Sequence, residues 1–455
     1  MLVRQERLVK APNVSVWLED FKDRMSVRLL VLKIFGSAVL LTITMVPIAF
    51  GSGSGRFPFG CSGRNEPCSQ LGIRTHQFSV TYCDITNTAW DSPEARNAMI
   101  PTSQTQQGVR HYEYVFPDGF IYVYDMDNHF ALVKHFGVPT YAGVRGAVAS
   151  AATGTLFVSY GSDKRGGSML AYNLHSDKVM WRRNYSFGVD SMSISLDGGT
   201  IYMPTGEVAS GGVWKVLDAR SGDVIASIDS GGTGPHNTVV NSNGSHVYLG
   251  PRYSNYLIVV SSRDNAVLQQ IGPVLNGVRP FTINAKETLT YITTTGFLGF
   301  HVADINTGKI IYTVPVRGFK AIGGAATCPS HGISLSPDEK EIYLIDSINS
   351  YVHVFDVSGG ASSMPIQVAD IPLRGSLSGD ESGCAYDCLK DGWIHHSRNG
   401  RYVFVGDSGD VIDTKIRTTV ATLPAMANAR KEVEIDFQNN NPVWAMINRS
   451  SVGMP

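Results

Sequence analysis

Short runs in which apolar and polar residues alternate recur along most of the chain, and turns rich in Gly, Asn, Asp or Ser separate them. The stretch 331–344, HGISLSPDEKEIYL, shows the pattern: a histidine opens an alternating run, a Ser-Pro-Asp turn follows, and a second apolar run ends it. Alternation with a period of two is typical of β-strands, and tight turns between such runs indicate antiparallel hairpins. The pattern therefore predicts an all-β protein built from many short strands.

Five windows of 14 residues align on this pattern without gaps. They begin at Arg145, Asp190, His236, Arg279 and His331, so their starts lie 45, 46, 43 and 52 residues apart. Two weaker copies flank them, HYEYVFPDGFIYV at the front and GWIHHSRNGRYVFV at the back. A repeat of this length is in the range of the blades of β-propellers, and the copies number seven.

Each unit continues with a third run and another turn, as in VWKVLDARSGDVIASI and GFHVADINTGKIIYTV. A single antiparallel sheet of this kind would leave two bare edges and unburied faces, whereas seven sheets stacked around an axis bury their faces. The sequence therefore predicts a seven-bladed β-propeller of four-stranded antiparallel blades over residues 75–446, followed by a tail, 447–455.

Three segments of the repeats, SPDEKEIYL, VHVFDV and DVIDT, resemble the repeats of YncE-like, YVTN-type seven-bladed propellers. That superfamily also includes lactonase-type propellers and the haem d1 domain of nitrite reductase. The resemblance covers roughly residues 75–444 and implies the fold. It implies no single function, because propellers of this class include enzymes, electron-transfer modules and binding platforms.

The N-terminal part differs from the repeats. Residues 34–50, IFGSAVLLTITMVPIAF, carry no charge; four basic residues precede them and GSGSG follows them. A positive flank, an apolar run and small residues are typical of a signal peptide or a membrane anchor. We therefore expect a cytoplasmic or n-region (1–33), a signal or anchor (34–50) and a linker (51–74). The propeller would then lie outside the cytoplasm, secreted or anchored by one transmembrane segment.

The six cysteines all follow the apolar segment: Cys61, Cys68, Cys83, Cys328, Cys384 and Cys388. Disulfides persist in compartments outside the cytoplasm, so this distribution agrees with export. Close pairs such as Cys61 with Cys68 are plausible disulfides, although the connectivity stays open. A metal site built from Cys384, Cys388, His395 and His396 has a spacing that matches no established zinc pattern, and we expect no metal there.

The overall charge limits the partners. Lys and Arg number 38 against 39 Asp and Glu, for a formal net charge of −1, and no basic run suggests a nucleic-acid partner. The chain has no CxxCH motif for haem attachment, and we expect no cofactor.

The first position of each window begins the innermost strand of its blade, near one mouth of the central channel. In the flanking copies, this position falls on Arg110 or His111 at the front and on Gly392, beside Asp391, at the back. The predicted ligand-binding ring is Arg110, Arg145, Asp190, His236, Arg279, His331 and Asp391. Polar groups that converge on a funnel are typical of a ligand site. The alternative is mutual pairing within the ring, for example of Arg145 with Asp190.

Two functions fit this ring. In the first, the chain is a binding or interaction protein whose funnel takes a small anionic molecule or an acidic loop of a protein partner, bound by forked arginine hydrogen bonds. In the second, it is a lactonase-like or lyase-like enzyme in which His331 or His236 is the general acid or base and Arg279 stabilises an oxyanion. Binding is preferred because no catalytic set of the family can be matched residue by residue.

The C-terminal region contains two further strand-like runs, EVEIDF and PVWAMI, separated by an Asn-rich turn. Propellers usually close when one end of the chain completes a blade that the other end begins. We therefore expect the tail to complete the front blade, with HQFSVTYC (76–83) as its N-terminal strand.

Overall fold

A computed structural model describes residues 108–449 apart from 163, 165, 322–327 and 383–388, and only the backbone of six short strands before residue 108. The chain divides into two compact units, Met1–Asn97 and Ala98–Pro455. In the first unit the strands pair as three hairpins: β1 (Arg7–Ala11) with β2 (Val14–Leu18), β3 (Leu29–Ile34) with β4 (Ser37–Thr42), and β5 (Gln70–Leu71) with β6 (Val80–Thr81).

The signal or anchor predicted at 34–50 lies outside the described residues, apart from the backbone of the strands that overlap it. The same holds for the linker predicted at 51–74. Within the part of the chain that the structure describes, no helix combines the length and the apolar character that crossing a membrane requires.

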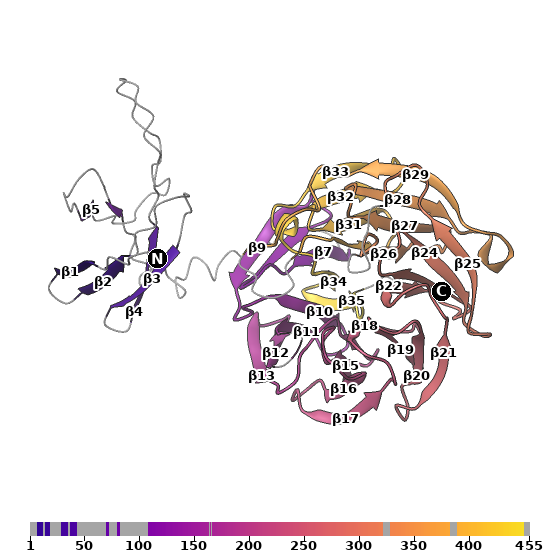
Figure 1. Cartoon of the computed structure of the whole chain (residues 1–455), viewed down its shortest axis with the longest axis horizontal. Coiled ribbons are helices and arrows are strands. Elements are labelled where there is room, and N and C mark those ends of the chain that lie inside the picture. The colour runs from indigo at the N-terminus through magenta and orange to yellow at the C-terminus, as the bar shows by residue number, and fades with distance from the viewer. Residues whose placement is uncertain are drawn as a thin grey trace, which may run out of the picture. The chain divides into compact units, whose positions relative to one another are not determined.

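The described part of the second unit is a ring of seven antiparallel sheets (Figure 1). We name these blades A to G in the order in which the chain forms them. Blade B consists of β10 (Val144–Ser150), β11 (Thr155–Gly161), β12 (Gly167–Asn173) and β13 (Lys178–Asn184). Blade C consists of β14 (Ser193–Ile194), β15 (Thr200–Pro204), β16 (Val213–Asp218) and β17 (Val224–Asp229). Blade D consists of β18 (Pro235–Val240), β19 (His246–Pro251), β20 (Leu257–Ser261) and β21 (Val267–Ile271).

Blades E to G follow the same order from the innermost strand outward. Their strands are β22 (Val278–Ile283), β23 (Leu289–Thr294), β24 (Gly299–Asp304) and β25 (Lys309–Pro315); β26 (Ile333–Leu335), β27 (Glu341–Asp346), β28 (Tyr351–Asp356) and β29 (Ile366–Pro372); and β30 (Trp393–His396), β31 (Tyr402–Gly406), β32 (Asp410–Asp413) and β33 (Thr418–Thr422). Two 3-10 turns, Gly360–Ser362 and Met426–Asn428, are the helical elements of the described region.

The five repeat windows coincide with the inner hairpins of blades B to F. In blade F, for example, Ile333 pairs with Leu344 across the hairpin. In four of the five windows the ninth position lies in the turn and takes a positive φ, for example +71° at Gly198 and +60° at Glu339; in the first window the tenth position, Gly154, does so at +62°. Glycine adopts this conformation without steric cost, which explains why turn glycines recur in the repeats.

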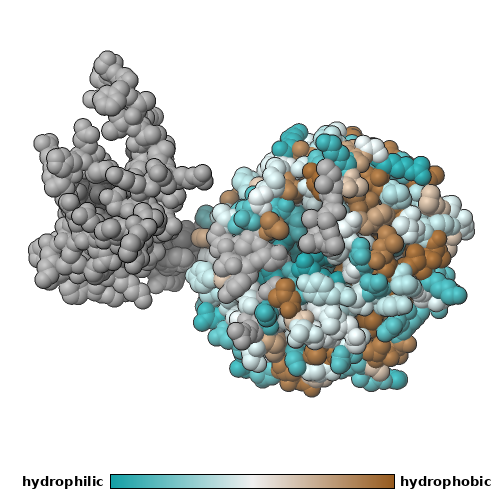
Figure 2. Space-filling view, in the orientation of Figure 1, coloured by the Kyte–Doolittle hydropathy of each residue, from teal (hydrophilic) through white to brown (hydrophobic). Residues whose placement is uncertain are grey.

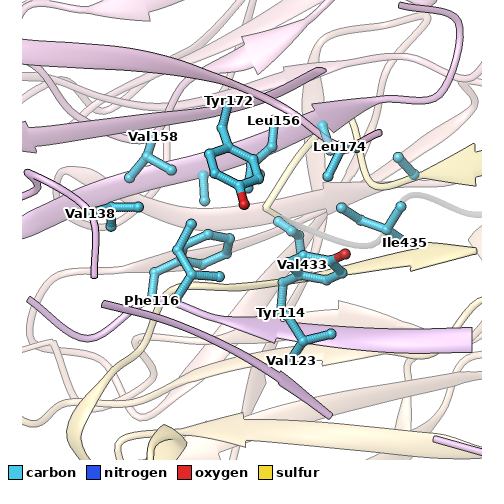
Figure 3. Close-up of a cluster of buried hydrophobic side chains, with 14 of the residues drawn as sticks. Tyr114, Phe116, Val123, Val138, Leu156, Val158, Tyr172, Leu174, Val433 and Ile435 are labelled. Carbon is cyan, nitrogen blue, oxygen red and sulfur yellow. The ribbon is translucent and has the colours of Figure 1, made fainter. Parts of the chain in front are cut away.

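Apolar side chains fill the space between neighbouring blades. Seven clusters of buried apolar residues lie between the blades, one for each pair of adjacent blades. Figure 3 shows the cluster between blades A and B. Phe116 of the β7–β8 turn and Leu156 of β11 both belong to this cluster. Because each blade buries apolar surface against both neighbours, the ring is stabilised only when it is closed. The seven-bladed fold predicted from the repeats is confirmed.

Blade A contains both ends of the propeller. Its order is β35 (Asn441–Ala445), β34 (Glu432–Gln438), β7 (Arg110–Val115), β8 (Phe120–Asp125) and β9 (Ala131–Gly137). The C-terminal strand β34 pairs with β7, so the predicted closure by the tail is confirmed. The partner is β7, however, and the strand predicted in HQFSVTYC lies outside the described residues apart from β6.

Four carboxyl side chains line this closure: Glu113 of β7 and Glu432, Glu434 and Asp436 of β34. Glu113 and Glu434 are direct cross-strand partners, and all four are buried. His395 Nε2 lies 3.1 Å from Glu113 Oε1, and Arg398 pairs with Asp436. Burial raises the pKa of Glu113 and Glu434 well above the usual range and that of Glu432 to about 7. The cluster therefore retains protons that exposed carboxyl groups would release.

Glu432→Gln is expected to reduce the pH dependence of stability. The folded pKa of Glu432, about 7, lies above its ordinary value of 4.5, so stability that is present at low pH is lost as the pH rises through this range. At pH 8 the variant should exceed the wild type by roughly 2 to 3 kcal/mol in free energy of unfolding, and at pH 4.5 the two should be similar. Urea unfolding at both pH values measures this difference. An equal difference in free energy of unfolding at pH 4.5 and pH 8 would contradict the raised pKa of Glu432. The exposed Asp264→Asn serves as control.

Candidate functional site

Six residues of the predicted ring lie together near the axis, each at or just before the start of an innermost strand. These are Arg145, Asp190, His236, Arg279, His331 and Asp391. The first five side chains are almost fully buried. Because the blades repeat, one window position places a side chain at the same height in every blade.

Glu207, from the loop between β15 and β16, connects the ring residues of blades B, D and E. Its carboxylate lies 3.7 Å from Arg145 and 3.4 Å from Arg279, and it also forms an ion pair with Arg252. His236 Nδ1 lies 3.8 Å from the same carboxylate. Sequence reasoning missed Glu207 because it occupies a loop rather than a repeating strand position.

Asp190 and His236 form a second contact in this half of the ring. His236 Nδ1 lies 2.9 Å from Asp190 Oδ2, whereas His236 Nε2 is buried without a hydrogen-bond partner. Burial alone would raise the pKa of Asp190, but His236 and then Arg145 lower it overall. Asp190 is therefore ionised, and it orients the imidazole so that Nε2 points away from it.

His331 and Asp391 belong to the other half of the ring. His331 Nδ1 lies 2.9 Å from the carbonyl oxygen of Gly392 and 3.1 Å from Asp391. Burial, with the charges of Arg430 and Arg279, lowers the pKa of His331 well below its usual value, so the ring is neutral. The His236 and His331 rings lie 6.2 Å apart and join the two halves.

Arg430 takes the ring position that the sequence assigned to Arg110. The strand that pairs with β7 on its inner side is β34, and Arg430 precedes β34 and pairs with Asp391 and Glu381. Arg110 lies on β7 and pairs with Asp125 and Asp127, with its side chain 45% exposed. The assignment of Arg110 to the ring is therefore corrected to Arg430: the front copy was aligned one strand too far from the axis.

Lys431, beside Arg430, extends the charged region. Lys431 Nζ lies 3.8 Å from Glu381. Burial and the charge of Arg430 lower the pKa of Lys431 to about 7, while burial and the charge of Glu381 raise that of Asp407 well above the usual range. The raised pKa favours the neutral form of Asp407, which does not offset the positive charge of its neighbours.

The C-terminal segment Met446–Arg449 runs along the inner strands. Met446 and Ile447 accept backbone hydrogen bonds from β10 and β14, of 2.9 and 3.0 Å. The Asn448 side chain bonds the backbone nitrogen and oxygen of Val240 on β18, at 2.8 and 2.9 Å. These contacts continue three residues beyond the propeller end predicted at Met446 and place Arg449 at the axis.

The Arg449 guanidinium carbon lies 3.8 Å from the centre of the Trp393 ring, in cation–π geometry. Its Nη1 lies 2.6 Å from Ser191 Oγ, and its Nη2 bonds the carbonyl oxygen of Arg430. Burial lowers the pKa of Arg449 to about 10. We call the whole set the central cluster: Arg145, Asp190, Glu207, His236, Arg252, Arg279, His331, Glu381, Asp391, Asp407, Arg430, Lys431 and Arg449.

Positive charge exceeds negative charge in the central cluster. Among its described residues, five arginines and Lys431 face five carboxyl groups, and the pKa of one of these, Asp407, is raised well above its usual range. Burying cations is costly unless anions compensate them. The arrangement can therefore accept a further negative group.

Arg252 and Asp391 give the cluster access to solvent, with side chains 20% and 26% exposed. Figure 2 shows hydrophilic surface near the centre of this view of the ring. The two longest connections between neighbouring blades, 316–332 and 373–392, precede β26 and β30, where His331 and Asp391 enter the cluster. Long loops held on a rigid scaffold frequently carry function.

The metal site considered for Cys384, Cys388, His395 and His396 has its cysteines outside the described residues. The two histidines point to opposite faces of β30: His395 stacks on Phe404, and His396 packs on Tyr343. Within the described residues, no group of three or more His, Cys, Asp or Glu side chains could hold a metal ion. Cys328, the described cysteine, is a buried free thiol.

The chain matches no family model and no curated protein. Solved structures with a similar backbone include the β-propeller domain of Cps50 (Swd1) from Myceliophteria thermophila, at 12% identity and a TM-score of 0.46, covering 62% of this chain and 86% of that one. Hydrazine synthase from Kuenenia stuttgartiensis is 14% identical, with a TM-score of 0.46 and coverages of 69% and 90%.

A third similar structure is the dihydro-heme d1 dehydrogenase NirN in complex with DHE. It is 12% identical, with a TM-score of 0.48, and the match covers 75% of this chain and 73% of that one. No family name follows from these matches. The resemblance to YncE-like propellers stays at the level of the repeats, and any function must be argued from the central cluster.

Proposed function

We propose that this chain is an extracytoplasmic binding or interaction protein whose central cluster takes an anionic group, from a small molecule or from an acidic segment of a protein partner. The observation that carries the proposal is the excess of buried positive charge at the axis. Arg279 and Arg252 share one carboxylate, that of Glu207. A carboxylate or phosphate would receive charge-assisted, forked hydrogen bonds from such guanidinium groups.

Arg279→Ala is expected to weaken the binding of an anion more than it weakens the fold. Loss of one charge-assisted hydrogen bond should reduce affinity by about 1.5 to 3 kcal/mol, or roughly 10- to 150-fold. Glu207 still faces Arg145 and Arg252 in this variant, so its charge stays compensated. Calorimetric titration with citrate and with pyrophosphate, together with thermal unfolding, separates the two effects. A large loss of stability with no anion binding would show that the arginines are only structural.

A second candidate function, hydrolysis or lyase chemistry, is favoured by one observation. In the tautomer that carries its proton on Nδ1 and donates it to Asp190, His236 would present a lone pair on the buried and unpartnered Nε2. A histidine oriented by a carboxylate is the arrangement of a general base, and Arg279 would supply the positive charge for an oxyanion. His331 fits this role less well, because its Nδ1 is held by Gly392 and its lowered pKa makes it a weaker base.

The two functions differ in one measurement. Turnover of lactones and esters that carry a carboxylate, abolished in His236→Ala and retained in His331→Ala, would establish the enzyme. If the wild type turns over none of these lactones and esters but still binds an anion, binding is the function. The exposed Asp264→Ala serves as control for both variants.

The extracytoplasmic location is part of the proposal. The uncharged segment 34–50 with its basic flank supports it, and so does the position of all six cysteines after this segment. Fractionation of the native host, with the intact mass of the recovered chain, tests it. Recovery from the cytosol with all thiols free would contradict it.

A further inference from the structure

Arg449 differs from the other arginines of the central cluster in its partners. Among the described residues, no carboxylate lies within ion-pair distance of its guanidinium. Its partners are the Trp393 ring, the Ser191 hydroxyl and the carbonyl oxygens of Arg430 and Arg145, the last at 3.5 Å. Its Nε is buried and has no hydrogen-bond partner. A buried cation in this situation is costly, because carboxyl groups such as Glu432 act on its charge only from beyond ion-pair distance and its Nε donor has no acceptor.

The segment that carries Arg449 is held firmly. The side chain of Asn448 bonds both backbone groups of Val240, and its Oδ1 also pairs with Ser193. Trp393 Nε1 donates a hydrogen bond of 3.0 Å to the carbonyl oxygen of Arg449 itself. The guanidinium is therefore positioned before any ligand arrives, which lowers the entropic cost of binding one.

We propose that Arg449 is a ligand-binding residue, whose Nε donates to the same anionic carboxylate or phosphate group that Arg279 and its neighbours bind from the opposite blades. This inference rests on the anion-binding function proposed above and adds one consequence. Because Arg449 follows β34 and β35 in the chain, ligand binding also holds the C-terminal segment in the channel. Closure of the ring and occupation of the cluster are then coupled.

The substitution Arg449→Ala removes the charge, and Arg449→Lys keeps the charge but removes Nε and the planar group that stacks on Trp393. We expect both to weaken binding of whichever probe the wild type binds, citrate for carboxylates or pyrophosphate for phosphates, by about tenfold or more in calorimetric titration. The exposed Arg263→Ala is the matched control and should bind as the wild type does. Hydrogen exchange of residues 446–449 should slow when the probe is added to the wild type.

The outcomes are distinguishable. If Arg279→Ala loses affinity but both Arg449 variants bind like the wild type, the inference fails and the proposed function stands. If the Arg449 variants only unfold at lower temperature, with unchanged affinity and unchanged hydrogen exchange on probe addition, Arg449 is a structural anchor and the inference is again wrong. If neither probe binds the wild type, the proposed function and the inference fail together.

Discussion

Removal of residues 431–455 is expected to leave a chain that does not fold into a stable monomer. The truncation deletes β34 and β35, and with them the fully buried Val433 and Ile435 between blades A and B. It also exposes the edge of β7 and the apolar faces of blades A, B and G. Each buried aliphatic side chain contributes roughly 1.5 to 3 kcal/mol, against a total stability of about 5 to 15 kcal/mol, so the loss exceeds what the propeller can absorb.

Circular dichroism and light scattering measure this result, with a chain that ends at Arg449 as control. The control keeps every contact that β34, β35 and the segment Met446–Arg449 make with blades A to D, and it should fold like the full chain. Unchanged thermal unfolding of the truncated chain would contradict closure of the ring by β34.

Glu207→Ala is expected to destabilise the fold by about 3 to 5 kcal/mol, the range for removing one partner of a buried ion pair. Glu207 is the shared carboxylate of Arg145, Arg252 and Arg279, so its loss leaves three guanidinium groups facing one another. Removal of any one of these arginines should cost less, because the carboxylate keeps the other two. The Glu207 carboxylate therefore contributes more to the free energy of unfolding than any one of the three arginines.

Urea unfolding of Glu207→Ala and Arg252→Ala, with Asp264→Ala as the exposed control, measures this asymmetry. A bound anion should restore part of the stability of Glu207→Ala, because it compensates the same arginines. Similar stability of Glu207→Ala and the wild type without any anion would mean that the cluster does not need this carboxylate.

The repeat predicted the fold and much of the central cluster for one physical reason. A propeller places equivalent window positions at equivalent points around an axis, so an alignment of Arg145, Asp190, His236, Arg279 and His331 in sequence is also an alignment in space. Buried apolar residues and turn residues each recur at fixed positions of the repeat, so both follow the same repeat length. The positions of these five residues therefore do not depend on how the loops fold.

The residues that sequence reasoning missed lie outside this repetition. Glu207 lies in a loop, where no periodic position marks it. Arg430 belongs to the blade completed by the C-terminal strand, so the front copy of the repeat could not reveal it and pointed to Arg110 instead. Arg449 follows the last strand, and its place at the axis depends on hydrogen bonds of Met446 to Asn448 with three inner strands.

Native mass spectrometry tests the central claim most directly. The full chain would be incubated with a mixture of small carboxylates and phosphates, and compared with the double variant Arg145→Ala/Arg279→Ala and with Arg263→Ala. We predict a bound anion on the wild type and on Arg263→Ala, and its loss from the double variant. A wild type that carries no anion, or an anion that the double variant retains equally, would contradict binding at the central cluster.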